Sequence, residues 1–201
     1  MTLAAQIRRR IARKPKGYPF TSKEFLSLGS RAAVDQALSR MAKAGEVARV
    51  TRGVFVVPQQ SQYVGMVPPT PEKVAAAMGA AAGETIAPHG AEAVRRLGLS
   101  TQTPMRPVFY SNGPSRRFQI GKLVVAIKHV SPRKLAFAGK PEGEVLSALW
   151  YLGKENVTPE IIERVRARVS EATFKKLCSA RQVMPGWMSN AFTRFEKTRL
   201  S

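Results

Sequence analysis

The sequence is poor in acidic residues, in cysteine and in long apolar runs, and each shortage excludes a class of protein. Only 13 of its 201 residues are Asp or Glu, and Asp35 is the only aspartate, so paired carboxylates for acid–base or metal chemistry are scarce. Cys178 is the only cysteine, which excludes an intrachain disulfide and a cysteine-based metal site and is typical of a cytoplasmic protein. No apolar run reaches the roughly 20 residues that a membrane-spanning helix needs.

Enzyme motifs are missing as well. The sequence has no Walker loop and no GxGxxG fingerprint, and its two histidines, His89 and His129, stand alone. An isolated histidine is more often a hydrogen-bonded structural residue than a catalyst. We therefore predict a protein that is not an enzyme, with no catalytic residue, no metal site and no cofactor.

Basic residues are abundant. Lys and Arg number 33, which gives a net charge of +20. Such an excess indicates a polyanionic partner, which could be DNA, RNA or an anionic membrane surface. Both parts of the chain are basic, because the residues up to Pro58 and the residues after it each carry a clear positive excess.

The most informative stretch is residues 30–58, SRAAVDQALSRMAKAGEVARVTRGVFVVP. Ser30 is a good N-cap, and an apolar stripe at helical spacing follows it as far as Met41. Gly45 tolerates the positive φ that ends a helix. The β-forming residues 47–57, interrupted by the turn at 51–53, predict a two-stranded hairpin.

Two interpretations of this stretch remain. A helix with a small polar outer face can enter the DNA major groove, and a hairpin beside it would be a wing over the phosphates. The alternative is a small α+β unit whose polar face is only solvated. On the first interpretation the expected DNA-binding residues are Ser30, Arg31, Ala32, Asp35, Gln36, Ser39, Arg40 and Lys43 on the helix and Arg49 and Arg52 on the hairpin.

The preceding residues complete the pattern of a winged helix-turn-helix domain over residues 1–58. Apolar residues every fourth position predict an amphipathic helix over 2–14, ended by Pro15, which we prefer to an organellar transit peptide. A short extended segment, 18–20, leads to Thr21 and Glu24, a capping box. The helix that it opens is expected over 22–28, with Phe25, Leu26 and Leu28 buried.

Residues 59–70 are rich in proline and glycine and predict a linker, with a strand over 63–67 as the alternative. Residues 71–201 then form a second, mixed α/β domain with a helical C-terminal part, so the expected fold class is α+β. Helices are predicted over 71–82, 90–97, 142–152, 159–169, 171–178 and 188–197, and strands over 85–87, 108–110, 118–120 and 123–127.

Basic turns in the second domain offer a second surface for phosphate. Its candidate residues are Arg116, Arg117, Lys128, Arg133 and Lys134, although solvated hairpin tips explain them equally well. The C-terminal aromatics Trp187, Phe192 and Phe195 lie among basic residues and could stack on single-stranded bases. Packing of a terminal helix into the core is the explanation that we favour.

Residues 30–41, Gly45 and residues 49–55 resemble AbiEi-type antitoxins of type IV toxin–antitoxin systems, and so do residues 87–93, 97–102 and 111–116. The resemblance implies a bacterial autorepressor that binds promoter repeats of its own operon as duplex DNA. It also implies an antitoxin that neutralises a nucleotidyltransferase-like toxin, without direct contact being assumed. We expect a cytoplasmic monomer with no membrane partner. The alternatives are a winged-helix regulator without a toxin and an RNA-binding protein.

Overall fold

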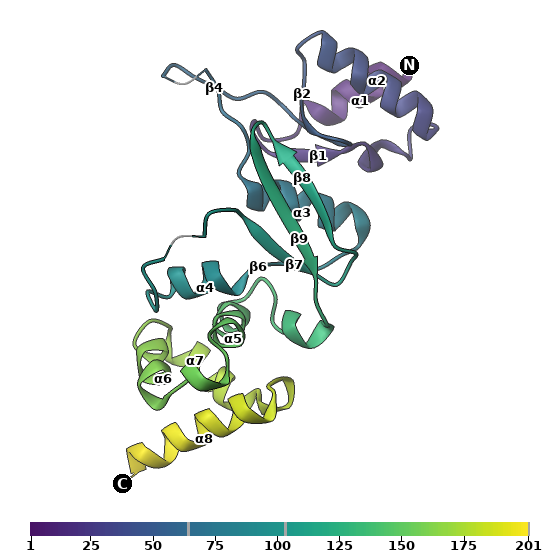
Figure 1. Ribbon diagram of the computed structural model, residues 1–201. Helices are drawn as coiled ribbons and strands as arrows, with labels where there is room; N and C mark the ends of the chain where they lie inside the picture. The colour runs from purple at the N-terminus through teal and green to yellow at the C-terminus, as the bar shows by residue number, and fades with distance from the viewer. Residues whose placement is uncertain (64, 103, 201) are drawn as a thin grey trace. The chain divides into compact units, whose positions relative to one another are not determined.

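The structure is a computed structural model that describes residues 1–63, 65–102 and 104–200. It confirms the predicted α+β class, with helices and small sheets alternating along the chain (Figure 1). The chain divides into two compact units. The first consists of Met1–Glu84 and Arg117–Val125, and the second of Thr85–Arg116 and Ala126–Ser201.

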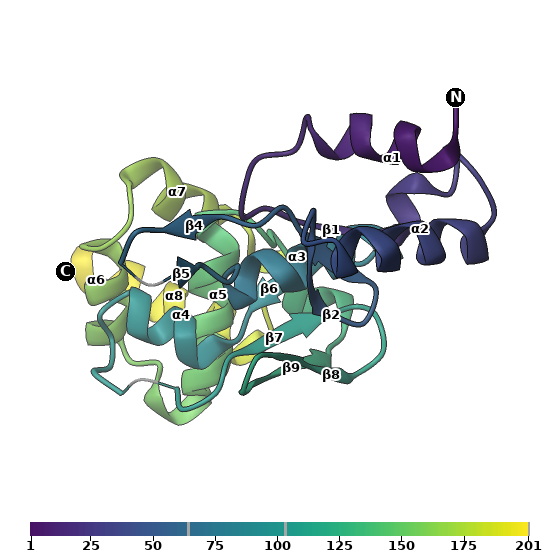
Figure 2. The ribbon, with the colours of Figure 1, turned by 90° about the horizontal axis from the view of Figure 1, so that it is seen from above.

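The first unit begins with three helical segments and a sheet. Its elements are α1 (Leu3–Ile11), β1 (Pro19–Thr21), the 3-10 helix η1 (Ser22–Phe25), α2 (Arg31–Lys43), β2 (Ala48–Thr51), β3 (Val54–Val56), β4 (Gln60–Ser61), β5 (Gly65–Met66) and α3 (Pro71–Ala82). Strand β3 lies between β1 and β2 and is antiparallel to both. Figure 2 shows α1 and α2 of this unit as separate coils joined through β1.

The core of the first unit forms where the helical stripes meet the sheet. Ile7 of α1 and Leu38 of α2 are fully buried, and both pack with Phe20 and Phe55, which are partners in the β1–β3 register. The rings of Phe20 and Phe55 stack with centroids 6.1 Å apart, and Phe25 meets Phe20 edge-on at 5.7 Å. Burying three aromatic rings in so small a unit contributes several kcal/mol, on the order of 1.5–3 kcal/mol for each.

Two predicted helices of this unit are shorter than the sequence suggests. Helix α1 ends at Ile11, because Arg13 and Lys14 bond to carbonyls three residues back as the chain approaches Pro15. The helix predicted over 22–28 is a 3-10 helix over Ser22–Phe25 followed by a turn, in which Leu26 and Leu28 bond to carbonyls three residues back. Its tighter turn leaves Leu26 39% exposed, so the prediction that Leu26 is buried was wrong.

The proline-rich stretch after β3 contains a small hairpin, because β4 pairs antiparallel with β5. Val64, within the strand considered for 63–67, lies outside the described residues. Helix α3 has the predicted bounds, with the Thr70 side chain accepting from Lys73 N at its start and Gly83 at φ 71° after its end. It packs against β1 and β3, and Lys23 Nζ donates to the Ala81 carbonyl at 3.1 Å. Helix α3 thus belongs to the first unit. Its alanine-rich sequence did not indicate which elements it would pack against.

The second unit joins a mixed sheet to a group of helices. Its elements are β6 (Ile86–Pro88), α4 (Gly90–Arg96), β7 (Val108–Ser111), β8 (Arg116–Ile120), β9 (Leu123–His129), η2 (Pro132–Leu135), α5 (Pro141–Leu152), η3 (Lys154–Asn156), α6 (Pro159–Arg166), α7 (Glu171–Ser179), η4 (Arg181–Val183) and α8 (Gly186–Leu200). The strand order is β6-β7-β9-β8; β7 runs antiparallel to β6 and parallel to β9. Residues Arg117–Val125 of β8 and β9 are grouped with the first unit.

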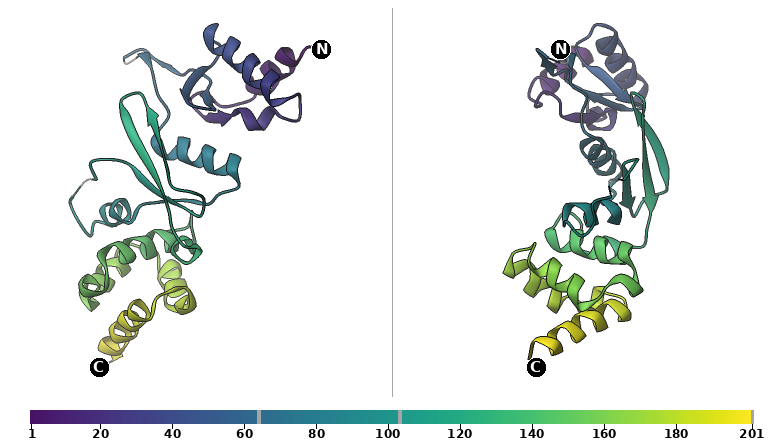
Figure 3. Two further views of the ribbon diagram at one scale, coloured as in Figure 1. Left: turned by 45° about the vertical axis from the view of Figure 1, so that its right-hand side comes forward. Right: turned by 60° about the vertical axis from the view of Figure 1, so that its left-hand side comes forward.

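The core of the second unit is mainly helical, and Figure 3 shows α5 to α8 gathered together in green and yellow. Leu149 of α5, Ile162 of α6 and Leu177 of α7 are fully buried in it. Phe192 and Phe195 of α8 are also buried, and their rings contact Phe174. The favoured interpretation of the terminal aromatics as core residues is therefore confirmed. No helix among the described residues is long and apolar enough to cross a membrane.

Candidate nucleic-acid interface

The solvent-facing side of α2 carries the residues that the sequence analysis proposed for DNA contact. Ser30 caps the helix, its Oγ accepting from Ala33 N at 3.4 Å. Val34, Leu38 and Met41 point into the core, which leaves the rest of the helix surface to solvent. Exposed or half-buried on that surface are Arg31, Ala32, Asp35, Gln36, Ser39, Arg40 and Lys43.

These side chains differ in how far they are already engaged. Arg31 Nε lies 3.7 Å from Asp35 Oδ2, one helical turn away, so part of its charge is compensated. Within the described residues, Gln36, Arg40 and Lys43 form no side-chain hydrogen bond or ion pair. Arg40 and Lys43 stand in the last turn of α2. The C-terminal half of the helix therefore presents an amide and two cations to any ligand.

The β2–β3 hairpin adds two arginines. Arg49 is exposed, stands opposite Phe55 in the register, and holds its guanidinium 5.3 Å from the centre of that ring. Arg52 is exposed in the turn, where Gly53 adopts φ 75° and so permits the reversal. Arg49 packs against the ring of Phe55. Among the described residues, the side chain of Arg52 forms no hydrogen bond or ion pair.

The basic residues of α1 contribute mainly to folding. Arg8 donates to both carboxylate oxygens of Glu46, at 2.7 and 2.8 Å, and this bond keeps the pKa of Glu46 below its ordinary value. Arg10 donates to the Glu24 carbonyl and to Ser27 Oγ, at 3.2 and 3.0 Å. Arg8 and Arg10 therefore tie α1 to the segments before and after α2.

The five residues of the second basic surface predicted from the sequence differ in how far they are already engaged. Arg117 belongs to the first unit, and the other four belong to the second. Arg133 donates to the carbonyls of Val183 and Met184, so it anchors η4. Lys134 Nζ lies 4.9 Å from the centre of the Trp150 ring. Arg116 bonds to the Pro114 carbonyl at 3.3 Å, and Lys128 is exposed on β9.

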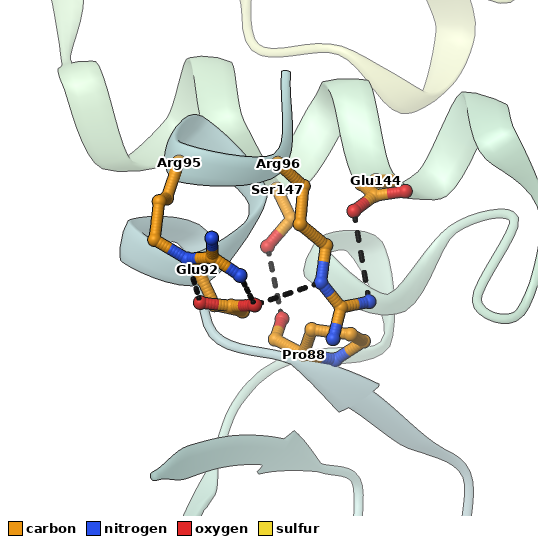
Figure 4. A network of polar contacts seen from close by, with 6 residues as sticks. All are labelled: Pro88, Glu92, Arg95, Arg96, Glu144 and Ser147. Carbon is orange, nitrogen blue, oxygen red and sulfur yellow. Dashed lines mark hydrogen bonds and ion pairs between the residues drawn. The ribbon is translucent and has the colours of Figure 1, made fainter. Parts of the chain in front are cut away.

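A network of polar contacts fixes the corner between α4 and α5 (Figure 4). Glu92 accepts from Arg95 at 2.8 and 2.7 Å and from Arg96 at 2.8 Å, and Arg96 reaches toward Glu144 of α5 at 3.8 Å. The bonds from Arg95, opposed by partial burial, lower the pKa of Glu92 to about 2. Ser147 Oγ donates to the Pro88 carbonyl at 3.2 Å, which joins α5 to β6.

At this corner the structure gathers aromatic and basic residues that the sequence analysis did not connect. The ring of His89 lies 4.7 Å from that of Tyr110 and 5.5 Å from that of Tyr151, measured between centroids. Burial lowers the pKa of His89, and the charges of Lys128 and Lys134 lower it further. Burial also raises the pKa of Tyr110.

One sequence signal could have pointed to this corner: the chain has no acidic residue between Glu92 and Glu142. His129 is separate from it and bonds through Nδ1 to the Gly113 carbonyl at 3.0 Å. Both histidines thus make backbone hydrogen bonds, since His89 Nδ1 accepts from Ala91 N at 3.2 Å. The described residues contain no group of three or more His, Cys, Asp or Glu side chains that could hold a metal ion.

Comparison with known protein families finds a match for most of the chain. Residues 6–177 fit a family of unknown function, DUF6088. No curated protein and no solved structure matches the chain. Because the family description assigns no activity, the resemblance to AbiEi-type antitoxins stays a prediction. The match spans most of both units, and the chain belongs to the DUF6088 family.

Proposed function

We propose that this protein is a DNA-binding transcriptional autorepressor and the antitoxin of a bacterial toxin–antitoxin system. In this proposal the first unit contains a winged helix-turn-helix, with α2 as the recognition helix and the β2–β3 hairpin as the wing. The observation that carries it is the outer surface of α2, where Gln36, Arg40 and Lys43 face solvent without an internal partner.

The order of elements supports this assignment. A helix, a strand, a second helical turn, a longer helix and a hairpin follow one another, and β3 lies between β1 and β2. Such an arrangement places the longer helix beside the hairpin, so that the helix can meet base edges while the hairpin meets the backbone. Gln36 offers paired donor and acceptor atoms suited to adenine, and Arg40 offers a fork suited to guanine.

The antitoxin part of the proposal rests on the sequence resemblance, which extends into the second unit. The proposed antagonist is a nucleotidyltransferase-like toxin encoded beside this gene, and no direct contact with it is assumed. A regulator without a toxin would have the same DNA-binding surface, and the neighbouring open reading frame distinguishes the two.

The test combines a promoter reporter with toxin rescue in one cell. The full chain is expressed beside the neighbouring gene and a reporter driven by its own promoter. We expect repression and growth rescue from the wild type, and growth rescue without repression from a Gln36→Ala, Arg40→Ala double variant. The control is Lys154→Gln, which removes an exposed charge from the second unit. A reporter that the wild type leaves unchanged would contradict the autorepressor.

A further inference from the structure

The sheet of the second unit places Tyr110 and Lys128 on the same face. They are direct partners in the parallel pairing of β7 with β9. Side chains of paired residues project to the same side of a sheet, and their neighbours along each strand project to the other. Those neighbours, Phe109 and Ile127, are buried, at 4% and 1% exposure. Tyr110 is only half-buried and Lys128 is exposed, so their face is the more open one.

His89 lies against Tyr110 and keeps one hydrogen-bonding atom unused. Its Nδ1 accepts a bond from Ala91 N, so in the neutral ring the hydrogen belongs to Nε2. Among the described residues, His89 forms no other hydrogen bond. The centroids of the His89 and Tyr110 rings lie 4.7 Å apart. In the neutral His89 ring, an N–H donor beside an aromatic ring is therefore left for a ligand.

Tyr151 supplies an exposed aromatic surface next to His89. It lies at the end of α5, its ring meets that of His89 edge-on, and half of the residue is exposed to solvent. The close approach of α4 to α5 fixes its position, because a Cβ on Gly90 would collide with the Ser147 carbonyl and with Tyr151 Cβ. Such an exposed ring is suited to stacking against a nucleobase.

Two lysines contribute positive charge at this corner. The charges of Lys128 and Lys134 both lower the pKa of His89. Lys134 lies over the ring of Trp150, which precedes Tyr151 in the sequence. Lys128 projects from the same face of the sheet as Tyr110. The nearest acidic residues in sequence to His89 and Tyr151 are Glu92 and Glu155, and Glu92 is bound by two arginines. Uncompensated ammonium groups beside aromatic rings favour an anion that carries a flat base.

We propose that this corner of the second unit is a nucleotide-binding site, in which Tyr151 stacks on the base and Lys128 and Lys134 bind the phosphate. His89 Nε2 donates a hydrogen bond to the same ligand. The ligand is a nucleotide unit, which a free nucleotide and a single-stranded nucleic acid both provide. The site is independent of the duplex-binding surface proposed for α2, because none of its residues belongs to the first unit.

Intrinsic fluorescence provides a direct assay. Trp150 and Trp187 are the only two tryptophans, their rings meet edge-on at 6.1 Å, and Lys134 lies over Trp150. A phosphate bound by Lys134 changes the surroundings of Trp150. The full-length protein is titrated with adenosine monophosphate, with a six-nucleotide oligouridylate and with inorganic phosphate. We expect a saturable change with at least one of the first two ligands, and binding at least tenfold weaker with phosphate alone.

Variants locate the site. Lys128→Gln and Tyr151→Ala should each weaken binding at least fivefold, whereas Lys154→Gln, an exposed lysine of η3, should change it less than twofold. Lys128 is exposed and Tyr151 is half-exposed, so circular dichroism should show unchanged helix content in both variants. Binding of the mononucleotide assigns a free nucleotide as ligand, and binding of the oligonucleotide alone assigns a single strand.

Two results would overturn the proposal. One is the absence of a saturable signal with both nucleotide ligands, and the other is an equal loss in Lys128→Gln and Lys154→Gln. Binding of duplex promoter DNA is measured on the same variants. Because Lys128→Gln should leave duplex binding unchanged, failure of the nucleotide site and failure of the proposed repressor function give different results.

Discussion

Arg8 and Glu46 form a two-point ion pair that joins α1 to the turn after α2, with Arg8 Nε 2.7 Å from Glu46 Oε2. Arg8 is the first of three consecutive arginines, and the sequence alone indicated only that they are positively charged. The ion pair shows that Arg8 also has a structural role. Its position matters for function, because it fixes the end of the helix that carries the proposed DNA-binding surface.

The first prediction compares Arg8, which is paired with Glu46, with its neighbour Arg9 in α1. Arg8→Gln removes both bonds to Glu46 and should lower the melting temperature slightly, with a smaller effect at high salt, because the pair is exposed. Arg9→Gln removes an equal charge from an exposed neighbour and should leave the melting temperature unchanged. Thermal unfolding followed by circular dichroism compares the two. Equal melting temperatures for both variants would show that the pair does not stabilise the fold.

The second prediction concerns pH. The pKa of Glu92 is lowered to about 2, so folding favours its charged form. Its stabilisation is fully present above the pKa of about 4.3 in the unfolded chain and is lost as the pH falls toward 2. After allowance for solvent screening, Glu92→Gln should cost about 1 kcal/mol at pH 7 and about half as much at pH 3. Urea unfolding at both pH values measures this, with Glu155→Gln as the control. A pH-independent cost would contradict it.

The third prediction tests the contact between α4 and α5. A methyl group at Gly90 meets the backbone of Ser147 and the Cβ of Tyr151, neither of which is a flexible chain end. Gly90→Ala should therefore destabilise the protein by about 1–3 kcal/mol. Gly186→Ala, where a Cβ meets nothing within 4 Å, is the matched control. Denaturant unfolding gives both values, and similar stabilities for the two variants would mean that the helices are not in close contact.

The fourth prediction distinguishes the proposed recognition helix from the proposed wing. Gln36→Ala and Arg40→Ala should each reduce discrimination between promoter and unrelated duplex by about 1–3 kcal/mol, as loss of a base contact does. Arg52→Ala should weaken both duplexes evenly, because a phosphate contact carries no sequence information. Competition binding on the two duplexes measures the difference. Equal loss of discrimination in all three variants would reverse the assignment of faces.

Much of the local structure could be predicted from the sequence, because its signals are themselves local. Thr70 and Gly83 bound α3 at the residues expected, and Gly45 follows α2 with φ 73°. The same signals do not report whether a turn is 3-10 or α, which depends on how the following chain returns to the core. Segment 22–28 and the end of α1 differ from the prediction for that reason.

The candidate sites show the same limit. The exposed face of α2 follows from helical spacing alone, and the structure places those residues at the surface. By contrast, His89 meets Tyr110 and Tyr151 only through the antiparallel pairing of β6 with β7 and a helix contact, which bring distant residues together. Arg133 likewise resembled a free basic tip until its backbone partners, 50 residues away, were found.

The central claim is that the surface of α2 and its neighbouring hairpin bind duplex DNA. Its most direct test is fluorescence anisotropy of a labelled duplex from the chain's own promoter, titrated with the full-length protein at increasing salt. Four basic side chains, Arg40, Lys43, Arg49 and Arg52, face solvent there, and each neutralised phosphate contributes about 0.9 to the slope of log affinity against log salt. We predict a slope of about −3 to −4 and tighter binding than to an unrelated duplex. A slope near zero, or equal affinity for both duplexes, would contradict the account.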